Sequence, residues 1–586
     1  MSVEKLIVDH METWTPALQT RSTAGRGSSG KIDLYGIKKL RELILELAVR
    51  GKLVPQDPND EPASELLKRI EVEKAVLVKQ GKIKKQKPLP EISEEEKPFE
   101  LPEGWEWATL TRIAEINPKI DVSDDEQEIS FIPMPLISTK FDGSHEFEIK
   151  KWKDVKKGYT HFANGDIAIA KITPCFENSK AAIFSGLKNG IGVGTTELHV
   201  ARPFSDIINR KYLLLNFKSP NFLKSGESQM TGSAGQKRVP RLFFENNPIP
   251  FPPLQEQERI IIRFTQLMSL CDQLEQQSLT SLDAHQQLVE TLLGTLADSQ
   301  NTGELAENWA RISEHFDTLF TTEASVDALK QTILQLAVMG KLVPQDPNDE
   351  PASELLKRIA AEKAQLVKEG KIKKQKLISA ICNKNTYPAL PSTWEWARLI
   401  DLVYLITDGA HHTPTYTQAG IPFISVKDIS SGNINFNETK FISHEQHKEL
   451  IKRCHPQRGD LLLTKIGTTG IPVIIDTDKE FSIFVSVALI KFPNHLINPN
   501  YLKLLISSPF VKKQSEEGTQ GVGNKNLVLK TISMFTLMIP PFEEQARIVD
   551  QVERIHVYCD KLINYIKSAQ QTQQHLADAL TEAAIN

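Results

Sequence analysis

The sequence predicts a mixed α/β (α+β) fold, in which long, antiparallel, coiled-coil-like helices separate two variable domains within a pseudo-twofold internal repeat. Three observations predict it. Residues 51–70 (GKLVPQDPNDEPASELLKRI) recur unchanged at 340–359, an offset of 289 in a chain of 586 residues. Short apolar runs broken by Gly, Asn and Pro fill 101–250 and 390–538, a pattern typical of mixed domains with short strands. Each such region ends in paired prolines followed by a long helical pattern.

Helical patterns also precede the variable domains. In each copy, apolar residues spaced 3-4-3 fall on one face of a helix. Gly51 and Gly340 stand where a glycine ends such a helix in the left-handed conformation. The apolar positions are Ile37, Leu40, Ile44 and Leu47 in the first copy and Val326, Leu329, Ile333 and Leu336 in the second.

The helices that follow Pro253 and Pro541 carry apolar residues at alternating steps of four and three, which is coiled-coil spacing. With two short seams in the chain, we expect these helices to form an antiparallel pair between the variable domains. The alternative is that each helix covers its own domain. The seams are Ile260, Phe264, Leu267, Cys271 and Leu274 in the first helix and Ile548, Val552, Ile555, Cys559 and Leu562 in the second.

These patterns divide the chain into five predicted regions, and the repeat makes the two variable domains counterparts of each other. The regions are an N-terminal helical region (1–100), the first variable domain (101–254), a central helical region for spacing and docking (255–389), the second variable domain (390–541) and a distal C-terminal helix (542–586).

The amino-acid composition limits the classes of protein to which this chain can belong. Hydrophobic residues make up 40% of the chain and charged residues 25%, which is typical of soluble globular proteins. The formal net charge of −4 excludes a wholly basic coat, so any contact with nucleic acid must use local patches. Five scattered cysteines without a CxxC pattern indicate a reducing compartment. No run approaches 18 apolar residues and the N-terminus lacks a signal-peptide pattern, so we expect a cytoplasmic protein without membrane contact.

Motifs for catalysis are incomplete. GRGSSGKI (25–32) is close to a phosphate-binding loop, but Ile32 stands where Ser or Thr must hold magnesium. IPPF (539–542) has the paired prolines of an amino-methyltransferase motif without its Asn or Asp. His411 and His412 lack a Cys or carboxylate at ligand spacing. We therefore predict that this chain has no catalytic residues, no metal site and no bound cofactor.

Two glycine-rich loops and two strand ends are the candidates for DNA contact. Glycine gives a loop backbone freedom, while Gln, Asn, Lys and Arg pair with base edges and phosphates. Lysines follow the similar segments GDIAIAK and GDLLLTK in the two halves. The ordinary alternative is that all of these side chains are merely solvated. The candidates are Lys171, Gln236, Lys237, Arg238 and Arg241 in the first domain and His412, Thr413, Lys465, Gln520, Asn524, Lys525 and Asn526 in the second.

Over residues 32–586 the chain resembles the specificity subunit of type I restriction–modification systems, in the branch with an extended N-terminus. GDIAIAKITP and GDLLLTKIGTTG are similar to the family's GD-hydrophobic-K segment, and DGAHHTPTYTQAGIPFISVKDI to its DG-H-TP opening. The segments that run into PFPPLQEQERI and MIPPFEEQARI are similar to its domain-closing segment. The first domain departs from the DG-H-TP pattern, having INPKIDVSDDEQEISFIPMPLIS instead, which implies a different DNA sequence.

The resemblance implies two target-recognition domains, each reading one part of a bipartite target in double-stranded DNA. It also implies helical regions that dock two methyltransferase subunits for adenine methylation, with motor–nuclease subunits joining for restriction of unmodified DNA. The partner subunits would use S-adenosylmethionine, ATP and magnesium, and this chain would be non-catalytic.

Other classes of function remain as alternatives. They are an enzyme whose site forms between the variable domains, a non-catalytic helical scaffold, and a sequence-nonspecific DNA-binding protein. An enzyme needs a reactive cluster at equivalent positions of both halves, and none is visible. A scaffold leaves unexplained why 111–240 and 400–530 diverge while 51–70 is repeated unchanged.

Overall fold

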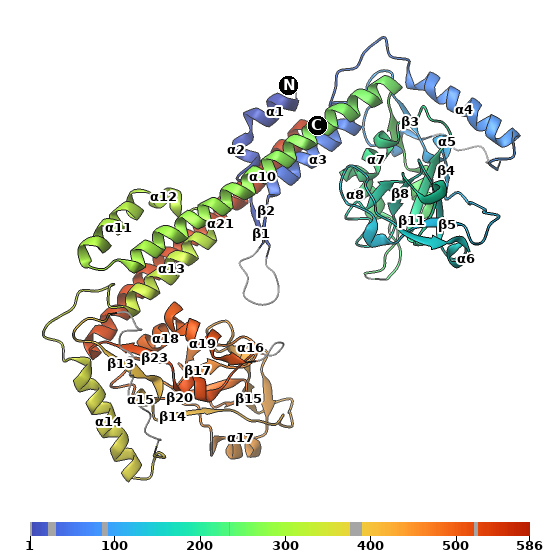
Figure 1. Cartoon of the computed structure of the whole chain (residues 1–586). Helices are drawn as coiled ribbons and strands as arrows, with labels where there is room; N and C mark the ends of the chain where they lie inside the picture. The colour runs from blue at the N-terminus through green and yellow to red at the C-terminus, as the bar shows by residue number, and fades with distance from the viewer. Residues whose placement is uncertain are drawn as a thin grey trace. The chain divides into compact units, whose positions relative to one another are not determined.

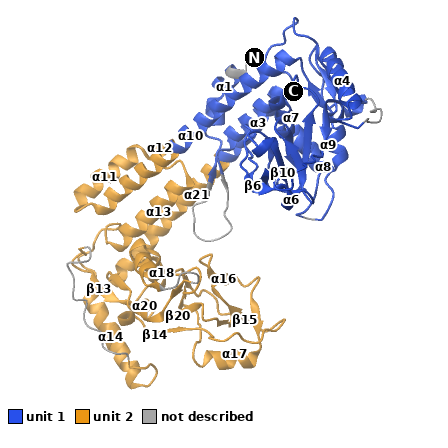
Figure 2. Cartoon of the chain, turned by 45° about the vertical axis from the view of Figure 1, so that its right-hand side comes forward, with its two compact units in different colours: residues 1–21, 31–280, 570–586 blue, residues 22–30, 281–569 orange. Residues whose placement is uncertain are grey.

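The computed structural model describes residues 3–21, 31–84, 92–233, 235–374, 389–520 and 525–585. The chain divides into two compact units, shown in different colours in Figure 2. Unit 1 comprises Met1–Arg21, Lys31–Thr280 and Gln570–Asn586, and the described part of unit 2 lies within Ser281–Ala569. Each unit contains one variable domain together with a group of helices (Figure 1).

The N-terminal helices of unit 1 form as the apolar spacing predicts. The four apolar residues predicted to share a face between Ile37 and Leu47 are all buried, because α3 turns that face inward. Gly51 ends the helix with a φ of 69°, a left-handed conformation that favours glycine. The elements are α1 (Val3–Asp9), α2 (Met11–Trp14), β1 (Gln19–Arg21), β2 (Lys31–Asp33), α3 (Tyr35–Val49) and α4 (Ala63–Lys79).

The first variable domain contains two four-stranded sheets and a two-stranded one. Their strand orders are β4-β11-β8-β9, β6-β5-β10-β7 and β12-β3, and the β5–β10 pair is parallel. The strands are β3 (Glu106–Ala108), β4 (Ala114–Ile116), β5 (Glu128–Ile132), β6 (Glu148–Lys151), β7 (Thr160–Ala163), β8 (Ile167–Ala170), β9 (Ala181–Ile183), β10 (Ile191–Gly194), β11 (Leu198–Pro203) and β12 (Ile249–Phe251). The helices are α5 (Leu110–Ile113), α6 (Trp152–Val155), α7 (Arg210–Lys218), α8 (Pro220–Ser228) and α9 (Arg241–Asn246).

Unit 2 repeats this plan. Gly340 ends α13 with a φ of 70°, as Gly51 ends α3. The helices before the second domain are α11 (Thr302–Glu314), α12 (Phe316–Leu319), α13 (Glu323–Val338) and α14 (Ala352–Lys368). The strands of the domain are β13 (Glu395–Arg398), β14 (Leu405–Asp408), β15 (Ile421–Ile424), β16 (Lys440–Ile442), β17 (Leu461–Thr464), β18 (Pro472–Ile474), β19 (Ser482–Ile483), β20 (Val487–Lys491), β21 (Thr519–Gln520), β22 (Asn526–Leu527) and β23 (Thr536–Ile539). Its helices are α15 (Leu399–Leu402), α16 (Val426–Ile429), α17 (His444–Ile451), α18 (Pro499–Ser507), α19 (Pro509–Glu517) and α20 (Leu529–Ser533).

Sheet topology confirms the internal repeat where the two sequences barely align. The antiparallel sheet β14-β20-β17-β18 has the order of β4-β11-β8-β9, and β13-β23 corresponds to β12-β3. The sheet β16-β15-β19 contains a parallel pair, as its counterpart does. The glycine–aspartate pairs that open β8 and β17 explain part of this match. Asp166 pairs with Arg202 of β11, and Asp460 pairs with Lys491 at the same place of β20.

The long helices α10 (Leu254–Asp298) and α21 (Phe542–Ile585) bury the predicted seams. All five seam residues of α10 are buried, as are Ile548, Val552 and Cys559 of α21, whereas Ile555 and Leu562 are partly buried. In unit 2, the last part of α10 shares a core with the first part of α21. In unit 1, Arg263 of α10 and Leu580 near the end of α21 line one groove. Both observations agree with the predicted antiparallel pairing.

A third helix joins this pair in each unit, which the seam spacing did not predict. In unit 1, Arg41 of α3 pairs with Asp272 of α10 at 2.7 Å, and Tyr35 donates to Asp578 of α21 at 2.8 Å. In unit 2, Lys330 of α13 pairs with Asp560 of α21. The alternative, that each long helix covers its own domain, also holds for the first turns of α10. There the centroid of the Phe264 ring lies 5.7 Å from that of Phe141 in the first domain.

Candidate DNA interface

Predicted residues far apart in the sequence meet at one edge of the second variable domain. Lys465 follows β17, and its amide donates to the carbonyl of Ser486 at 2.9 Å. The amide of Leu527 donates to the Lys465 carbonyl at 2.7 Å, and that of Gly467 donates to the Lys525 carbonyl at 3.0 Å. The segment before α20 therefore pairs antiparallel with the residues that follow β17, through an isolated bridge between Ile466 and Asn526.

The first domain builds the same edge with the same backbone register. The amide of Lys171, after β8, donates to the Glu197 carbonyl at 2.9 Å. The amide of Val239 donates to the Lys171 carbonyl at 2.8 Å, and that of Thr173 donates to the Lys237 carbonyl at 3.0 Å. This register makes Lys171 the counterpart of Lys465, Lys237 that of Lys525, and Arg238 that of Asn526. We call these two places the recognition edges.

Arg238 is held firmly at the recognition edge of the first domain. Its Nε and Nη2 both donate to the Glu197 carboxylate at 2.9 Å, and its Nη1 donates to the carbonyl of Gln236 at 3.0 Å. The Arg238 hydrogen bonds hold the pKa of Glu197 below its ordinary value. The fork on the carboxylate and the bond to Gln236 fix the base of the loop. The side chains of Gln236 and Lys237 are exposed.

Arg241 lies just outside this cluster. It is the first residue of α9 and pairs with Glu245 one turn later, at 2.7 Å. Behind the edge, His199 of β11 is buried, and one ring nitrogen lies 3.1 Å from the Val239 carbonyl oxygen. Burial lowers the pKa of His199 to about 4, so the histidine is neutral and supports the loop from within.

Lys465 has a different environment from an exposed DNA-contacting lysine. It is buried, and its Nζ lies 2.9 Å from Oδ2 of Asp408, the last residue of β14. The second oxygen of Asp408 lies 2.9 Å from Nε2 of His411 and 3.0 Å from Nη2 of Arg453. Burial alone would raise the pKa of Asp408, but hydrogen bonds from Lys465 and His411 outweigh it and lower that pKa. DNA contact by Lys465 stays a prediction.

The other candidates of the second domain differ in how far the structure describes them. Asn526 is partly buried, and its Oδ1 has no hydrogen-bond partner among the described residues. The backbone of Gln520 pairs with Asn526 through β21 and β22, while Asn524 lies outside the described residues. The candidates with exposed side chains are His412, Thr413 and Lys525.

Sequence reasoning missed Glu197 and Arg453. No motif marks either residue, and Arg453 lies after α17 in a stretch that no repeat pattern distinguishes. Both become visible only in the folded sheet, where Glu197 adjoins Lys171 and Arg453 reaches Asp408. The pairing of β4 with β11 aligns Pro118 with Asp408, which lies at the same place in the pairing of β14 with β20. Because proline has no carboxylate, the described residues of the first domain form no cluster like that of Asp408.

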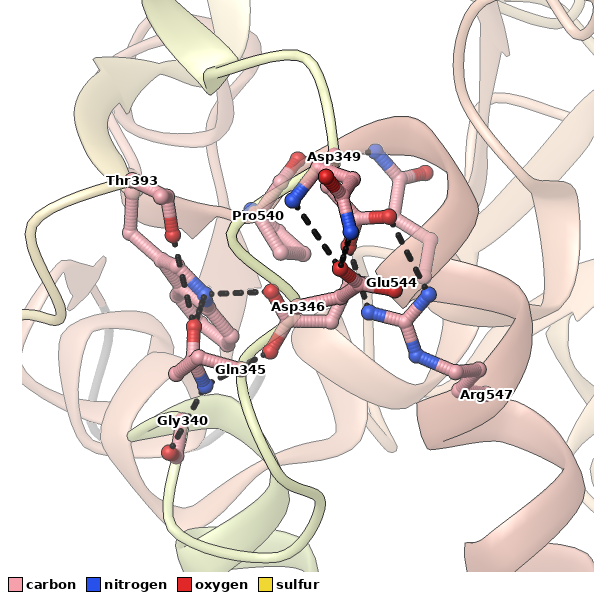
Figure 3. Close-up of polar contacts among 11 residues, drawn as sticks. Gly340, Gln345, Asp346, Asp349, Thr393, Pro540, Glu544 and Arg547 are labelled. Carbon is pink, nitrogen blue, oxygen red and sulfur yellow. Dashed lines mark hydrogen bonds and ion pairs between the residues drawn. The ribbon is translucent and has the colours of Figure 1, made fainter.

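A second duplicated polar site lies where α21 begins, and Figure 3 shows its contacts. Glu544 is buried and accepts hydrogen bonds from the Trp394 indole at 3.0 Å and the Gln345 amide at 2.8 Å. Arg547, one turn further on, pairs with Asp349. Burial raises the pKa of Glu544. Gln345 and Asp349 belong to the repeated segment, which explains part of its invariance.

Unit 1 contains the same arrangement at the start of α10. Glu256 accepts from the Trp105 indole at 2.9 Å and from the Gln56 amide at 3.0 Å. Arg259 pairs with Asp60, and burial raises the pKa of Glu256. We call these two sites the helix junctions. Their hydrogen bonds and ion pairs hold the repeated segment against the long helix and against the tryptophan at the start of the variable domain.

The described part of the chain contains neither a metal cluster nor a membrane span. No three or more His, Cys, Asp or Glu side chains are grouped where they could hold a metal ion in this part. Within the same residues, no helix has the length and apolar character needed to cross a membrane.

Comparison with known proteins identifies the family. A family model described as the type I restriction modification DNA specificity domain matches residues 102–284 and 391–569. The chain is 71% identical over 591 residues to the type I restriction enzyme EcoAI specificity subunit of Escherichia coli, with 100% of both chains covered. It is 60% identical to the EcoEI specificity subunit of Escherichia coli, again covering 100% of both. One chain in a solved structure of a type I restriction–modification system aligns with this protein at a TM-score of 0.48 and 16% sequence identity. The alignment covers 83% of this chain and 99% of that chain. The chain therefore belongs to the family of type I restriction enzyme specificity subunits, and its two variable domains are DNA specificity domains.

Proposed function

We propose that each variable domain reads one half of a bipartite target in double-stranded DNA through its recognition edge. The observation that supports this proposal is that the edges share a backbone register and two lysine positions but differ in other side chains. Arg238 with its partner Glu197 has Asn526 as its counterpart in the second domain. Such an arrangement keeps the geometry of DNA approach constant while the donors and acceptors presented to base edges change.

The long helices are proposed to set the distance between the two half-sites. A helix rises 1.5 Å for each residue, so a change in helix length translates into a change of distance along DNA. Salt bridges from α3 and α13 onto α10 and α21 support this role, because a third helix stiffens the pair in each unit.

Two methyltransferase subunits are proposed to dock on the helical regions, one on each copy of the repeated segment. The two copies present the same exposed side chains. Packing does not constrain exposed positions, so packing alone does not explain why these residues are identical in both copies. Two equal surfaces on one chain suit two copies of one partner. The exposed positions shared by the copies include Asp57, Asn59, Glu65, Lys68 and Arg69, which correspond to Asp346, Asn348, Glu354, Lys357 and Arg358.

The partners are proposed to carry the chemistry. The methyltransferase subunits would take their methyl group from S-adenosylmethionine for adenine methylation. Motor–nuclease subunits would use ATP and magnesium to restrict DNA that lacks the modification. The proposed location is the cytoplasm, because the DNA target lies there.

Methylation mapping tests the proposal. The chain is expressed with its methyltransferase subunits, and methylated adenines are mapped by single-molecule sequencing of the host DNA. The expected result is a site with two specified parts and a fixed unspecified gap. Methylation at a single continuous sequence would contradict two independent readers, and methylation without sequence preference would favour the nonspecific DNA-binding alternative.

A further inference from the structure

Arg453 lies at the recognition edge of the second domain, where one carboxylate serves three groups. Asp408 is 4% exposed, and its two oxygens contact Lys465, His411 and Arg453. Among the described residues, Asp408 is the one acid that pairs with either Lys465 or Arg453. One carboxylate carries one negative charge and faces both an ammonium and a guanidinium, so the cluster has more basic groups than acidic ones. Lys465 is buried, so of these two groups the Arg453 guanidinium is the one facing solvent.

A single nitrogen anchors Arg453. Its Nη2 lies 2.7 Å from the carbonyl oxygen of Asp408, 2.7 Å from that of Gly409 and 3.0 Å from the Asp408 carboxylate. The side chain is nevertheless 56% exposed. The Asp408 and Gly409 backbone thus fixes the guanidinium through Nη2, while Nε and Nη1 have no hydrogen-bond partner among the described residues.

This anchoring discriminates between two kinds of DNA contact. A guanidinium offers two forks of parallel N–H donors, Nε with Nη2 and Nη1 with Nη2, and bidentate recognition of guanine requires one of them. Both forks include Nη2, whose two hydrogens already have three acceptors. Nε and Nη1 can still donate singly. A phosphate oxygen needs only a charged single donor, whereas a guanine edge needs the fork.

We propose that Arg453 holds a phosphate of the DNA backbone beside the second half-site, and that Asp408 is the positioning residue that aims it. This proposal rests on the proposed function, because it assumes that the second domain reads DNA. The described residues of the first domain contain no equivalent, since Pro118 replaces Asp408 and Arg238 is paired with Glu197.

The test uses the complex of this chain with its methyltransferase subunits. Binding is measured by fluorescence anisotropy between about 50 and 200 mM salt. The probes are a duplex carrying the mapped methylation site and a duplex of the same composition with the second half-site scrambled. Arg453→Ala is compared with Arg453→Gln, which removes the charge but keeps a polar side chain of intermediate length. Arg458→Ala is the matched control, because this exposed arginine precedes β17 at the opposite end of the strand.

Removal of a phosphate-binding arginine has a defined signature. Arg453→Ala should weaken binding to both duplexes by a similar factor, on the order of tenfold. It should also make the slope of log affinity against log salt shallower by about one. Arg453→Gln should show the same change of slope because the charge is lost, and Arg458→Ala should change neither quantity. The methylated sequence should be unchanged in all three.

Two results would overturn the proposal. A wild-type salt slope in Arg453→Ala and Arg453→Gln, in complexes that assemble normally, would show that Arg453 does not contact a phosphate. Relaxed methylation at one position of the second half-site would show that it reads a base. Failure of the proposed function looks different, because then the wild-type complex itself would bind both duplexes equally.

Discussion

At the recognition edge of the first domain, Arg238 is forked onto Glu197, whereas at the same edge of the second domain Lys465, His411 and Arg453 share Asp408. The backbone hydrogen bonds around these side chains are the same in both domains. At the helix junctions, by contrast, backbone and side chains are both repeated, down to the tryptophan, glutamine and glutamate that meet there. The difference between the two kinds of site teaches that the helix junctions are repeated in backbone and side chains, whereas the recognition edges repeat the backbone and only part of the side chains.

The largest effect is expected from changing the length of the helices. We predict that four residues added near Leu282 of α10, matched by four in the facing part of α21, lengthen the gap between the half-sites by about two base pairs, since four residues add roughly 6 Å. Binding to the original site should fall roughly 10³-fold, to the nonspecific level. An insertion in α10 alone should instead disrupt the packing of Val289, Leu293 and Leu296 against α21. Methylation mapping supplies the measurement, and an active double insertion with the original gap would rule out the helices as a ruler.

Breaking a helix junction comes next in size. Glu544→Ala should leave the Trp394 indole and the Gln345 amide without their buried acceptor. The indole keeps only its 3.2 Å hydrogen bond to the Gln345 side-chain oxygen, and the amide keeps only its 3.3 Å hydrogen bond to the Gly340 carbonyl. Hydrogen bonds to charged groups contribute about 1.5–3 kcal/mol each, so the free energy of unfolding should fall by roughly 2–5 kcal/mol. Glu256→Ala should cost a similar amount in unit 1. Chemical denaturation measures both, and a large cost for one variant alone would show that the two junctions are not equivalent.

The loop of the first recognition edge should have a smaller and more selective effect. We predict that alanine at Gln236, Lys237, Arg238 and Arg241 relaxes only the first half-site and weakens binding by about 1–3 kcal/mol for each base that the loop hydrogen-bonds in the wild type. Alanine at Lys525 and Asn526 should act on the second half-site alone. Lys151→Ala with Lys153→Ala is the control, because these exposed lysines of the first domain pair with Glu126. Unchanged affinity and salt slope in the fourfold variant would mean that the loop is only solvated.

The smallest predicted effect is on pH dependence. Burial raises the pKa of Glu256 and Glu544 above the ordinary value of 4.5. A raised pKa in the folded state means that the stabilising contribution is complete below pH 4.5 and is lost as the pH rises through the folded-state pKa. Glu256→Gln with Glu544→Gln should therefore flatten the fall of stability above pH 4.5. Denaturation at a series of pH values measures it, and an unchanged profile would contradict the assignment.

The sequence predicted the repeat, the helix seams and much of the recognition edges. It paired Lys171 with Lys465 because both follow a glycine–aspartate strand, and their equivalence is confirmed by register. It could not predict that Lys465 is buried against Asp408, since their partnership depends on strands β14, β20 and β17 lying side by side. The sequence patterns did not predict the roles of Arg453 and Glu197 for the same reason. The sequence patterns also did not predict that α3 and α13 join the pair of long helices. Coiled-coil spacing shows that one face of a helix is buried, but it does not show how many helices cover that face.

Replacing one variable domain tests the central claim most directly. Residues 101–250 are exchanged for the corresponding segment of a specificity subunit with a different target, leaving both helix junctions intact, and methylated adenines are mapped in cells that contain the methyltransferase subunits. We predict that one half of the target changes while the other half and the gap stay the same. A change in both halves would contradict the claim that two independently reading edges are mounted on a repeated frame.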